Sequence, residues 1–285
     1  MATNTIKVAD LAKVQNVDFV NKFNGGIDKL MQVLGVTERI EMATGTQLKV
    51  YKTSGTLASG TVAEGEEIPL SKYKNELAAT YELTFDKWRK QTTMEAIAKR
   101  GYEQAVTGTD DKMLRDIQKG IRSGIFGFLA TGTGVATGEN FQKALANAWG
   151  NLAVAFEDDS ATPVYFVHPL DIADYLGGAT ISLQNAFGFS YVENFLGLGT
   201  VIVDTNVVQG KVYATAQENI NLYYANASAI EGFDFYSDET GLIGVYHDTT
   251  YSNATLDTIS TSAIKLFPEY LDRVVISTIV PAEEG

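Results

Sequence analysis

Cysteine is absent from the 285-residue sequence, and histidine occurs only twice, as His168 and His247. The absence of cysteine excludes disulfides, thiolate metal ligands and cysteine nucleophiles. Two histidines without cysteine leave few ways to build a zinc site or a nucleophile with its base. We therefore expect no catalytic residue, no metal and no other cofactor. Both histidines are expected to be structural, with His168 helping to begin a helix at Pro169.

Long apolar runs and a basic surplus are also missing. No stretch approaches the roughly 18 uncharged apolar residues of a membrane-spanning helix, and the N-terminus lacks the apolar core of a signal peptide. These features predict a soluble protein that has no membrane partner and is not exported by a classical signal. With 35 acidic and 22 basic residues, the net charge is −13, which repels phosphate over most of the surface. A dedicated nucleic-acid binder is not expected.

The sequence otherwise has the composition of a globular protein, with 45% hydrophobic and 20% charged residues. Its 14 Tyr and 14 Phe suit large interfaces as well as cores. Short strand-like runs alternate with helical patterns, which predicts an α+β fold. No internal repeat and no proline-rich linker divides the chain, so we expect domains that interleave.

Residues 46–90 are strand-like at both ends and rich in Gly, Ser, Thr and Glu between them, which predicts a long hairpin. Apolar and polar residues alternate on its returning side, as in a strand with one covered face. The apolar positions are Leu77, Ala79, Tyr81, Leu83 and Phe85. A hairpin of this length has too little core to be stable alone, so its apolar face must rest on another part of the chain or on another subunit.

Helices are predicted on both sides of the hairpin. Residues 1–15 show no clear period and predict an arm, whereas apolar residues at three- and four-residue spacing predict a helix from Asp18 to Leu34 that ends at Gly35. Residues 92–95 match a capping box, which predicts that Thr92 caps the next helix. Farther on, a second amphipathic helix is predicted, with Phe141, Leu145, Ala148, Trp149, Leu152 and Phe156 on one side.

The helix expected near residues 110–130 carries two stripes. The apolar stripe is formed by Met113, Leu114, Ile117, Ile121 and Ile125. The basic stripe is formed by Lys112, Arg115, Lys119 and Arg122, about 150° around the helix axis. Two interpretations of the basic stripe remain open. It is either a solvated face paired with acids of this or a neighbouring subunit, or a surface for weak, sequence-independent contact with DNA.

In their order along the chain, these features resemble the major capsid proteins of tailed bacteriophages, which have the Hong Kong 97 fold. The resemblance covers nearly the whole chain. It is clearest in DKMLRDIQKGIRSGIFGFLATGTG, in PVYFVHPLDIADYL and in GLGTVIVDTNVVQGKVYATAQENINLYYA. The C-terminal run DRVVISTIV is apolar enough to form a central strand.

The resemblance implies an α+β, Hong Kong 97-like capsid fold in four parts. These are an N-terminal arm and helix (1–45), an extended β-hairpin loop (46–90), a peripheral domain with a spine helix (91–138 and 228–285), and an axial domain (139–227). Axial domains would meet around pentamer and hexamer axes. The extended loop would lie over a neighbouring subunit, and the spine helix would turn its basic stripe toward the shell interior.

The function implied by the resemblance is that of a coat protein. It would self-assemble into an icosahedral shell around double-stranded DNA, be assembled in the cytoplasm of a bacterial host and become part of the virion capsid. Its partners would be other copies of itself, a portal and packaged DNA, together with a separate scaffolding protein, because no scaffolding segment precedes the arm. Some relatives weld subunits by isopeptide bonds. Lys72 and Lys74 lie in the loop here, but no asparagine partner can be named.

Two alternatives remain. An encapsulin-like compartment would be built in the same way but filled with enzyme cargo. A soluble hydrolase that uses carboxylates is supported only by the surplus of Asp and Glu, and the chain offers few catalytic partners for them.

Overall fold

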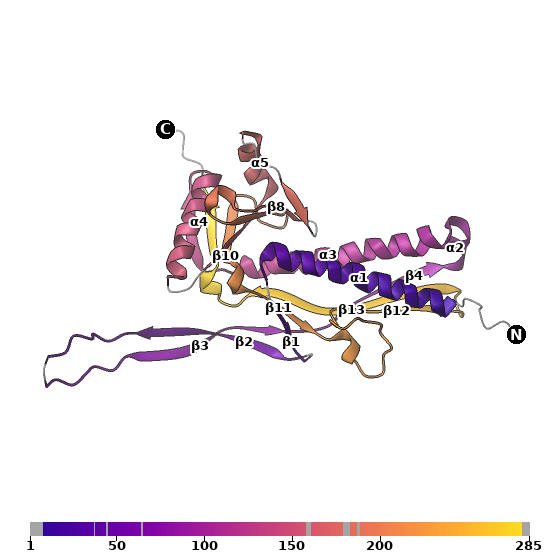
Figure 1. Ribbon diagram of the computed structural model, residues 1–285, viewed down its shortest axis with the longest axis horizontal. Helices are drawn as coiled ribbons and strands as arrows, with labels where there is room; N and C mark the ends of the chain where they lie inside the picture. Colours follow the sequence, from indigo (N-terminus) through magenta and orange to yellow (C-terminus); the bar gives the residue numbers. More distant parts are fainter. Residues whose placement is uncertain are drawn as a thin grey trace.

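The computed structural model describes residues 8–36, 38–43, 45–63, 65–157, 161–178, 183–186 and 189–280. Two sheets, of five and seven strands, share the chain, and a two-stranded hairpin projects away from both (Figure 1). Helices lie along one face of the five-stranded sheet. Among the described residues, none of the helices combines the length and the apolar character needed to cross a membrane.

The first helix, α1, runs without interruption over Val8–Leu34. The expectation of an arm up to residue 15 is therefore wrong for residues 8–15, and the paired glycines Gly25 and Gly26 do not break the helix. Its buried stripe consists of Phe19, Val20, Phe23, Ile27, Leu30 and Leu34. The predicted end is confirmed, because Gly35 has a φ of 70°, which favours glycine. At Gln15 the apolar pattern gives no signal because the contact is polar: its side chain accepts a hydrogen bond from the Tyr102 hydroxyl.

The five-stranded sheet is built around β13 (Thr255–Pro268), its longest strand. The strand β11 (Ile220–Ala225) pairs with residues 263–268 of β13, and β12 (Gly244–Thr250) pairs with residues 255–261. The strand β4 (Asp86–Thr93) pairs with residues 255–262, and the short β1 (Arg39–Glu41) joins β11. The helices α1 and α3 pack on one face of this sheet and share one apolar core with it.

After β4 the chain forms α2 (Met94–Arg100), a π-helix (Glu103–Thr107) and α3 (Gly108–Leu129). Thr93, not Thr92, is the N-cap of α2: its hydroxyl accepts from the Ala96 amide at 3.3 Å, whereas Thr92 is a buried residue of β4. The strand continues one residue farther than expected, so the predicted capping box is wrong. The apolar stripe of α3 is confirmed, with Leu114, Ile117 and Ile125 buried.

The seven-stranded sheet has the order β5-β14-β10-β6-β9-β8-β7. Its strands are β5 (Gly134–Gly138), β6 (Pro163–Val167), β7 (Gln184–Ala186), β8 (Phe189–Val192), β9 (Thr200–Val203), β10 (Lys211–Ala216) and β14 (Val275–Ile279). The helix α4 (Phe141–Ala155) packs against it, and α5 (Pro169–Gly178) follows β6. Of the predicted apolar side of α4, only Trp149 is exposed. The run DRVVISTIV forms β14 between β5 and β10, so the prediction of a central strand is confirmed.

Three strands belong to a different sheet from the other strands of their expected domain. Both β5 and β14 fall within the ranges expected for the peripheral domain, yet they belong to the seven-stranded sheet. Conversely, β11 falls within 139–227 and belongs to the five-stranded sheet. Strand pairing between distant segments, which local sequence patterns do not encode, sets these boundaries.

The hairpin consists of β2 (Gln47–Thr56) and β3 (Lys72–Glu82), with a register shift at Val50/Tyr51. The predicted long hairpin is thus confirmed, but it ends before residue 90, because residues 86–93 form β4. Its base is anchored: Leu83 is buried, and the Tyr81 ring meets the edge of Phe128 of α3 at 5.1 Å. Beyond Tyr81 the hairpin leaves the body of the molecule (Figure 1).

We predict that Leu30→Ala lowers the free energy of unfolding by about 2–5 kcal/mol, because Leu30 is fully buried between α1 and the sheet. Urea unfolding of the purified protein measures this cost. Lys29→Ala, at the exposed neighbouring position, should change stability by less than about 0.5 kcal/mol. Equal effects of the two substitutions would contradict the assigned face of α1.

Candidate functional site

The basic stripe of α3 divides into an exposed part and a buried part. Lys112, Arg115 and Lys119 are exposed. Lys112 pairs with Asp116 one turn along the same helix. Within the described ranges of the chain, neither Arg115 nor Lys119 forms an ion pair. These two side chains are therefore the cations of the stripe most available to an anionic partner.

Arg122 does not belong to the exposed stripe, and its placement there was wrong. Its Nε lies 3.2 Å from Asp204 Oδ2, and the two side chains are only 15% and 3% exposed. Asp204 follows β9, so this pair joins α3 to the seven-stranded unit. The buried sector of α3 widens here, because Phe126 and Leu129, four and seven residues after Arg122, are also buried. The apolar residues Phe126 and Leu129 were therefore the sequence signal that could have indicated that Arg122 is buried.

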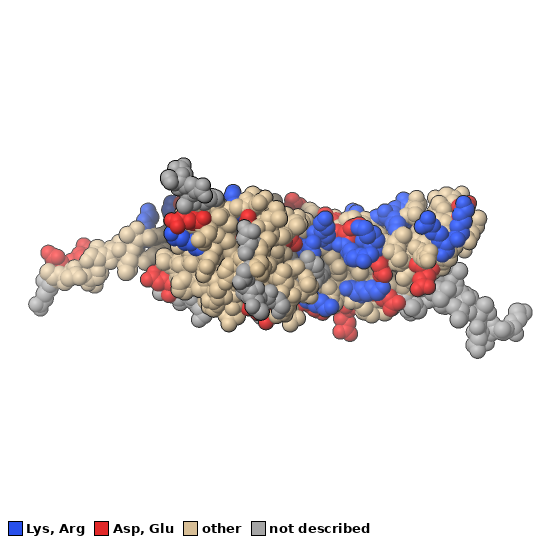
Figure 2. All heavy atoms as spheres, turned by 90° about the horizontal axis from the view of Figure 1, so that it is seen from above, with Lys and Arg blue, Asp and Glu red and all other residues tan. Residues whose placement is uncertain are grey.

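The helix side of the molecule carries most of the visible basic groups. Figure 2, which looks onto α1, α2 and α3, shows Lys and Arg gathered over these helices with some acidic groups among them. Besides the exposed α3 cations, the exposed basic residues here are Lys22, Lys29, Lys99 and Arg100. Lys22 is paired with Asp111 at 2.7 Å, so the surface is only locally positive.

The outer part of the hairpin leaves large apolar side chains in solvent. Leu70 is 95% exposed, Leu57 is 75% and Ile68 is 74%, and both Tyr73 and Leu77 are more than half exposed. The predicted covered face is therefore covered at the base of the hairpin only. In the single chain, solvent therefore covers most of the surface of Leu57, Ile68 and Leu70 on this projecting hairpin.

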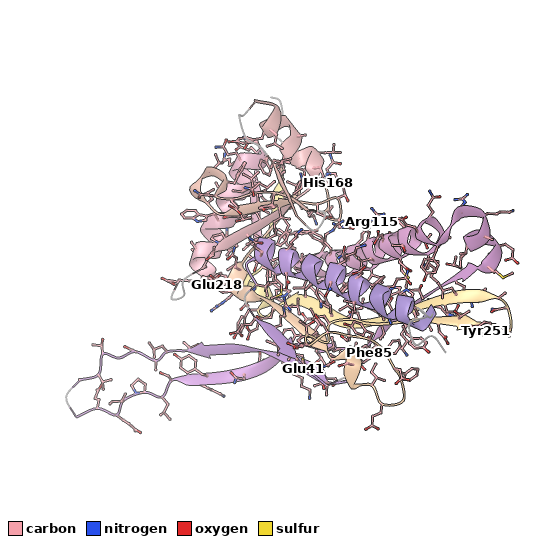
Figure 3. All side chains as sticks on the ribbon, turned by 45° about the vertical axis from the view of Figure 1, so that its right-hand side comes forward. Glu41, Phe85, Arg115, His168, Glu218 and Tyr251 are labelled. Atoms are coloured by element: carbon pink, nitrogen blue, oxygen red, sulfur yellow. The ribbon has the colours of Figure 1, made fainter. Side chains whose placement is uncertain are left out.

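An apolar groove lies on the side of the five-stranded sheet opposite the helices. It has a volume of about 540 Å³ and is lined by Phe85, Ile230, Phe233, Phe235, Tyr246 and Ile259, with Lys87 and Asp234 beside them. Phe233 is 64% exposed and stacks on Phe235 with ring centroids 5.6 Å apart. Figure 3 shows Arg115 on the helix side of the sheet and Phe85 on the opposite side. Local periodicity does not predict this groove, because Ile230, Phe233 and Phe235 come from the loop between β11 and β12.

The structure brings together no recognisable catalytic set in the residues it describes, and no cluster of His, Asp and Glu there could hold a metal ion. His168 acts locally, as predicted: its Nδ1 accepts from the Leu170 amide at 3.2 Å in the first turn of α5. His247 is buried, with Nε2 3.2 Å from Asp110 Oδ2. The contact between His247 and Asp110 was not predicted from the sequence, because the two residues lie 137 positions apart.

Solved structures of shell-forming proteins share this arrangement of helices, sheets and hairpin. No protein-family model and no curated sequence matches the chain. A subunit of the cyanophage A-1(L) capsid is 13% identical with a TM-score of 0.57, covering 88% of this chain and 92% of that one. The chain has the Hong Kong 97-type capsid fold. This α+β fold was predicted from the order of the elements.

The same capsid fold occurs in two other matching structures. An encapsulin complex from Synechococcus elongatus is 12% identical with a TM-score of 0.56, covering 89% of each chain. A virus-like particle from Pyrococcus furiosus is 16% identical with a TM-score of 0.53, covering 95% of this chain and 100% of that one. At these identities, the similarity establishes the capsid fold and leaves the contents of any particle open.

We predict that Arg122→Gln destabilises the protein by about 3 kcal/mol, because it leaves the buried carboxylate of Asp204 without its cation. Arg115→Gln removes an exposed cation of the same stripe and should cost less than about 0.5 kcal/mol. Thermal or urea unfolding of both variants makes the comparison. If both variants were as stable as the wild type, this would contradict the burial of the Arg122–Asp204 pair.

Proposed function

We propose that this chain is the coat subunit of a tailed bacteriophage and assembles into an icosahedral shell of pentamers and hexamers. The observation that carries the proposal is the projecting hairpin, whose apolar outer part is exposed in the single chain. The capsid fold supports it, because the matching structures are subunits of closed particles. No catalytic step is part of this function.

Burial of the hairpin on a second copy explains why its apolar residues are tolerated. Exposed apolar patches are typical of surfaces that bind other proteins. Full burial of Leu57, Ile68 and Leu70 would contribute about 1.5–3 kcal/mol each. In the proposed pentamers and hexamers each hairpin lies on the next copy, which is a head-to-tail contact, and such contacts close into rings when the rotation between subunits allows it. The apolar groove around Phe233 is one available surface for such a contact.

We predict that Leu70→Asp abolishes or strongly reduces particle formation while leaving the subunit folded, because it places a charge in a contact that must lose its water. Thr61→Asp adds the same charge at an exposed polar position of the same loop and should still assemble. Light scattering and negative-stain microscopy measure particles, and circular dichroism checks the fold. Normal particles from Leu70→Asp would contradict the role of the hairpin.

The proposed content of the shell is double-stranded DNA. The supporting observation is the locally positive helix side, where Arg115 and Lys119 are exposed. With a net charge of −13, the whole chain would repel DNA if its charges were spread evenly. A few cations turned to the interior would make weak contacts with phosphate that do not depend on the DNA sequence.

We predict that replacing Lys112, Arg115 and Lys119 with Gln spares shell formation but weakens DNA retention. If each cation contacts one phosphate, the slope of log affinity against log salt should fall by about 2.7. Nuclease protection at increasing salt measures retention. As a control, Lys143, an exposed lysine of α4 that lies outside both the hairpin and α3, is changed to Gln. Retention that is unaffected by the α3 changes would exclude a DNA-facing stripe.

An encapsulin-like compartment is the second candidate, since one matching structure is a holo-encapsulin complex. The content of purified particles decides between the two candidates: nuclease-protected DNA supports the phage coat, and a co-purified enzyme supports the compartment. For the phage coat, the proposed location is the virion capsid after assembly in the bacterial cytoplasm. Its further proposed partners are a portal and a separate scaffolding protein.

A further inference from the structure

The interface between the helices and the five-stranded sheet changes from apolar to polar along β13. On the helix side of this strand, Leu266 and Ile264 belong to the main core. Because side chains alternate along a strand, Ser262, Ser260 and Thr258 face the same side, and all three are buried. The Ser260 and Thr258 hydroxyls have no hydrogen-bond partner among the residues that the structure describes.

Charged and polar side chains from four elements meet over this polar end. Lys90 of β4 donates to Asp110 of α3 at 2.5 Å, and the other oxygen of Asp110 lies 3.2 Å from His247 Nε2 of β12. The second ring nitrogen of His247 contacts the Asn16 side-chain oxygen of α1. Asp110 and His247 are buried, and Lys90 is nearly so. These four residues are called the Asp110 cluster.

The Asp110 cluster also supports the π-helix before α3. The Lys90 ammonium donates to the Val106 carbonyl at 3.1 Å and to the Thr109 hydroxyl at 2.7 Å. Gln15 of α1 donates to the Thr107 hydroxyl at 3.4 Å. Wider turns of this kind leave carbonyl groups poorly paired, and they occur often at functional positions. The first turns of α1, the π-helix and the start of α3 are therefore linked to one another by polar contacts.

The charge state of Asp110 agrees with this geometry. Burial would raise its pKa, but hydrogen bonds with His247 and Lys90 and the positive charge of Lys90 outweigh burial and hold the pKa of Asp110 below its ordinary value. From the π-helix segment, Tyr102 also faces this carboxylate, which contributes to raising the pKa of Tyr102 after the larger effect of burial. Asn16 is the neutral member from α1. The carboxylate is therefore ionised when the cluster is closed.

We propose that residues 8–18 of α1 and residues 102–112 form a separable cap that lifts from the polar end of the sheet while the apolar end stays packed, with the Asp110 cluster as its catch. Polar groups that leave a protein contact regain hydrogen bonds to water, and among residues 15–18 and 102–112 Val106 is the one large apolar side chain that is fully buried. Opening this end therefore exposes little apolar surface. Opening the other end would expose the Phe23, Ile27 and Leu30 side chains, which are fully buried. The cap can therefore separate from the sheet while the apolar part of α1 stays packed.

Amide hydrogen exchange on the purified full-length protein tests the cap. In His247→Leu, exchange over residues 15–22 and 103–110 should accelerate about tenfold, as expected when a charged buried hydrogen bond is lost. Residues 26–34 of α1 should keep their wild-type protection. His168→Leu, which changes the only other histidine, should leave both regions unchanged. Acceleration spread evenly along α1, or none at all, would overturn the proposal.

A second variant tests whether the Asp110 cluster only holds the cap closed or is required for folding. Changing Lys90 to Met, Asp110 to Leu and His247 to Leu replaces the cluster by apolar groups without altering the net charge of the Lys–Asp pair. Apolar replacement of a buried charged set can stabilise a protein. Protection of residues 15–22 should then rise above that of the wild type. A fall over the whole chain would show that the cluster is required for folding, and the separable cap would be rejected. Neither result depends on whether the protein forms shells, which is measured separately.

Discussion

The hairpin's apolar surface is the constraint on which the account of this protein depends. Apolar side chains in solvent cost free energy, and a two-stranded hairpin cannot build a core of its own. At the base, this cost is avoided because Tyr81 packs on Phe128 and Leu83 lies in a small core with Ala225 and Ala263. Beyond the base, Leu57, Ile68 and Leu70 are between 74% and 95% exposed in the single chain. In the proposed shell, a second copy of the chain supplies the missing surface.

The remaining structure gives this hairpin a fixed direction. Its base is fastened to the five-stranded sheet, and the Arg122–Asp204 pair joins α3 to the seven-stranded unit. Interleaving of the chain, with β5 and β14 in one sheet and β11 in the other, adds covalent links between the two parts. A body held in this way can present the hairpin, the groove around Phe233 and the positive helix side in constant relative positions. Such constancy is what repeated head-to-tail contacts need.

The sequence predicted those features that depend on local periodicity. Alternation near Tyr81 predicted the hairpin, and three- and four-residue spacing predicted the buried faces of α1 and α3. Features that depend on contacts between distant segments were not predictable in this way. Arg122 looked like a surface residue because its neighbours on the helix are basic, but a unit that begins after residue 133 buries it. The contact between His247 and Asp110 has no local signature either. Gln15 and Asn16 of α1 give no apolar signal because both make polar contacts.

The most direct measurement of the central claim is an electron cryomicroscopy map of the purified assembled protein at side-chain resolution. In the proposed shell, the map should show closed particles in which Leu57, Ile68 and Leu70 of each hairpin are buried against a neighbouring copy. Particles whose hairpins extend into solvent without a protein contact would contradict it. So would a protein that remains a monomer under every assembly condition.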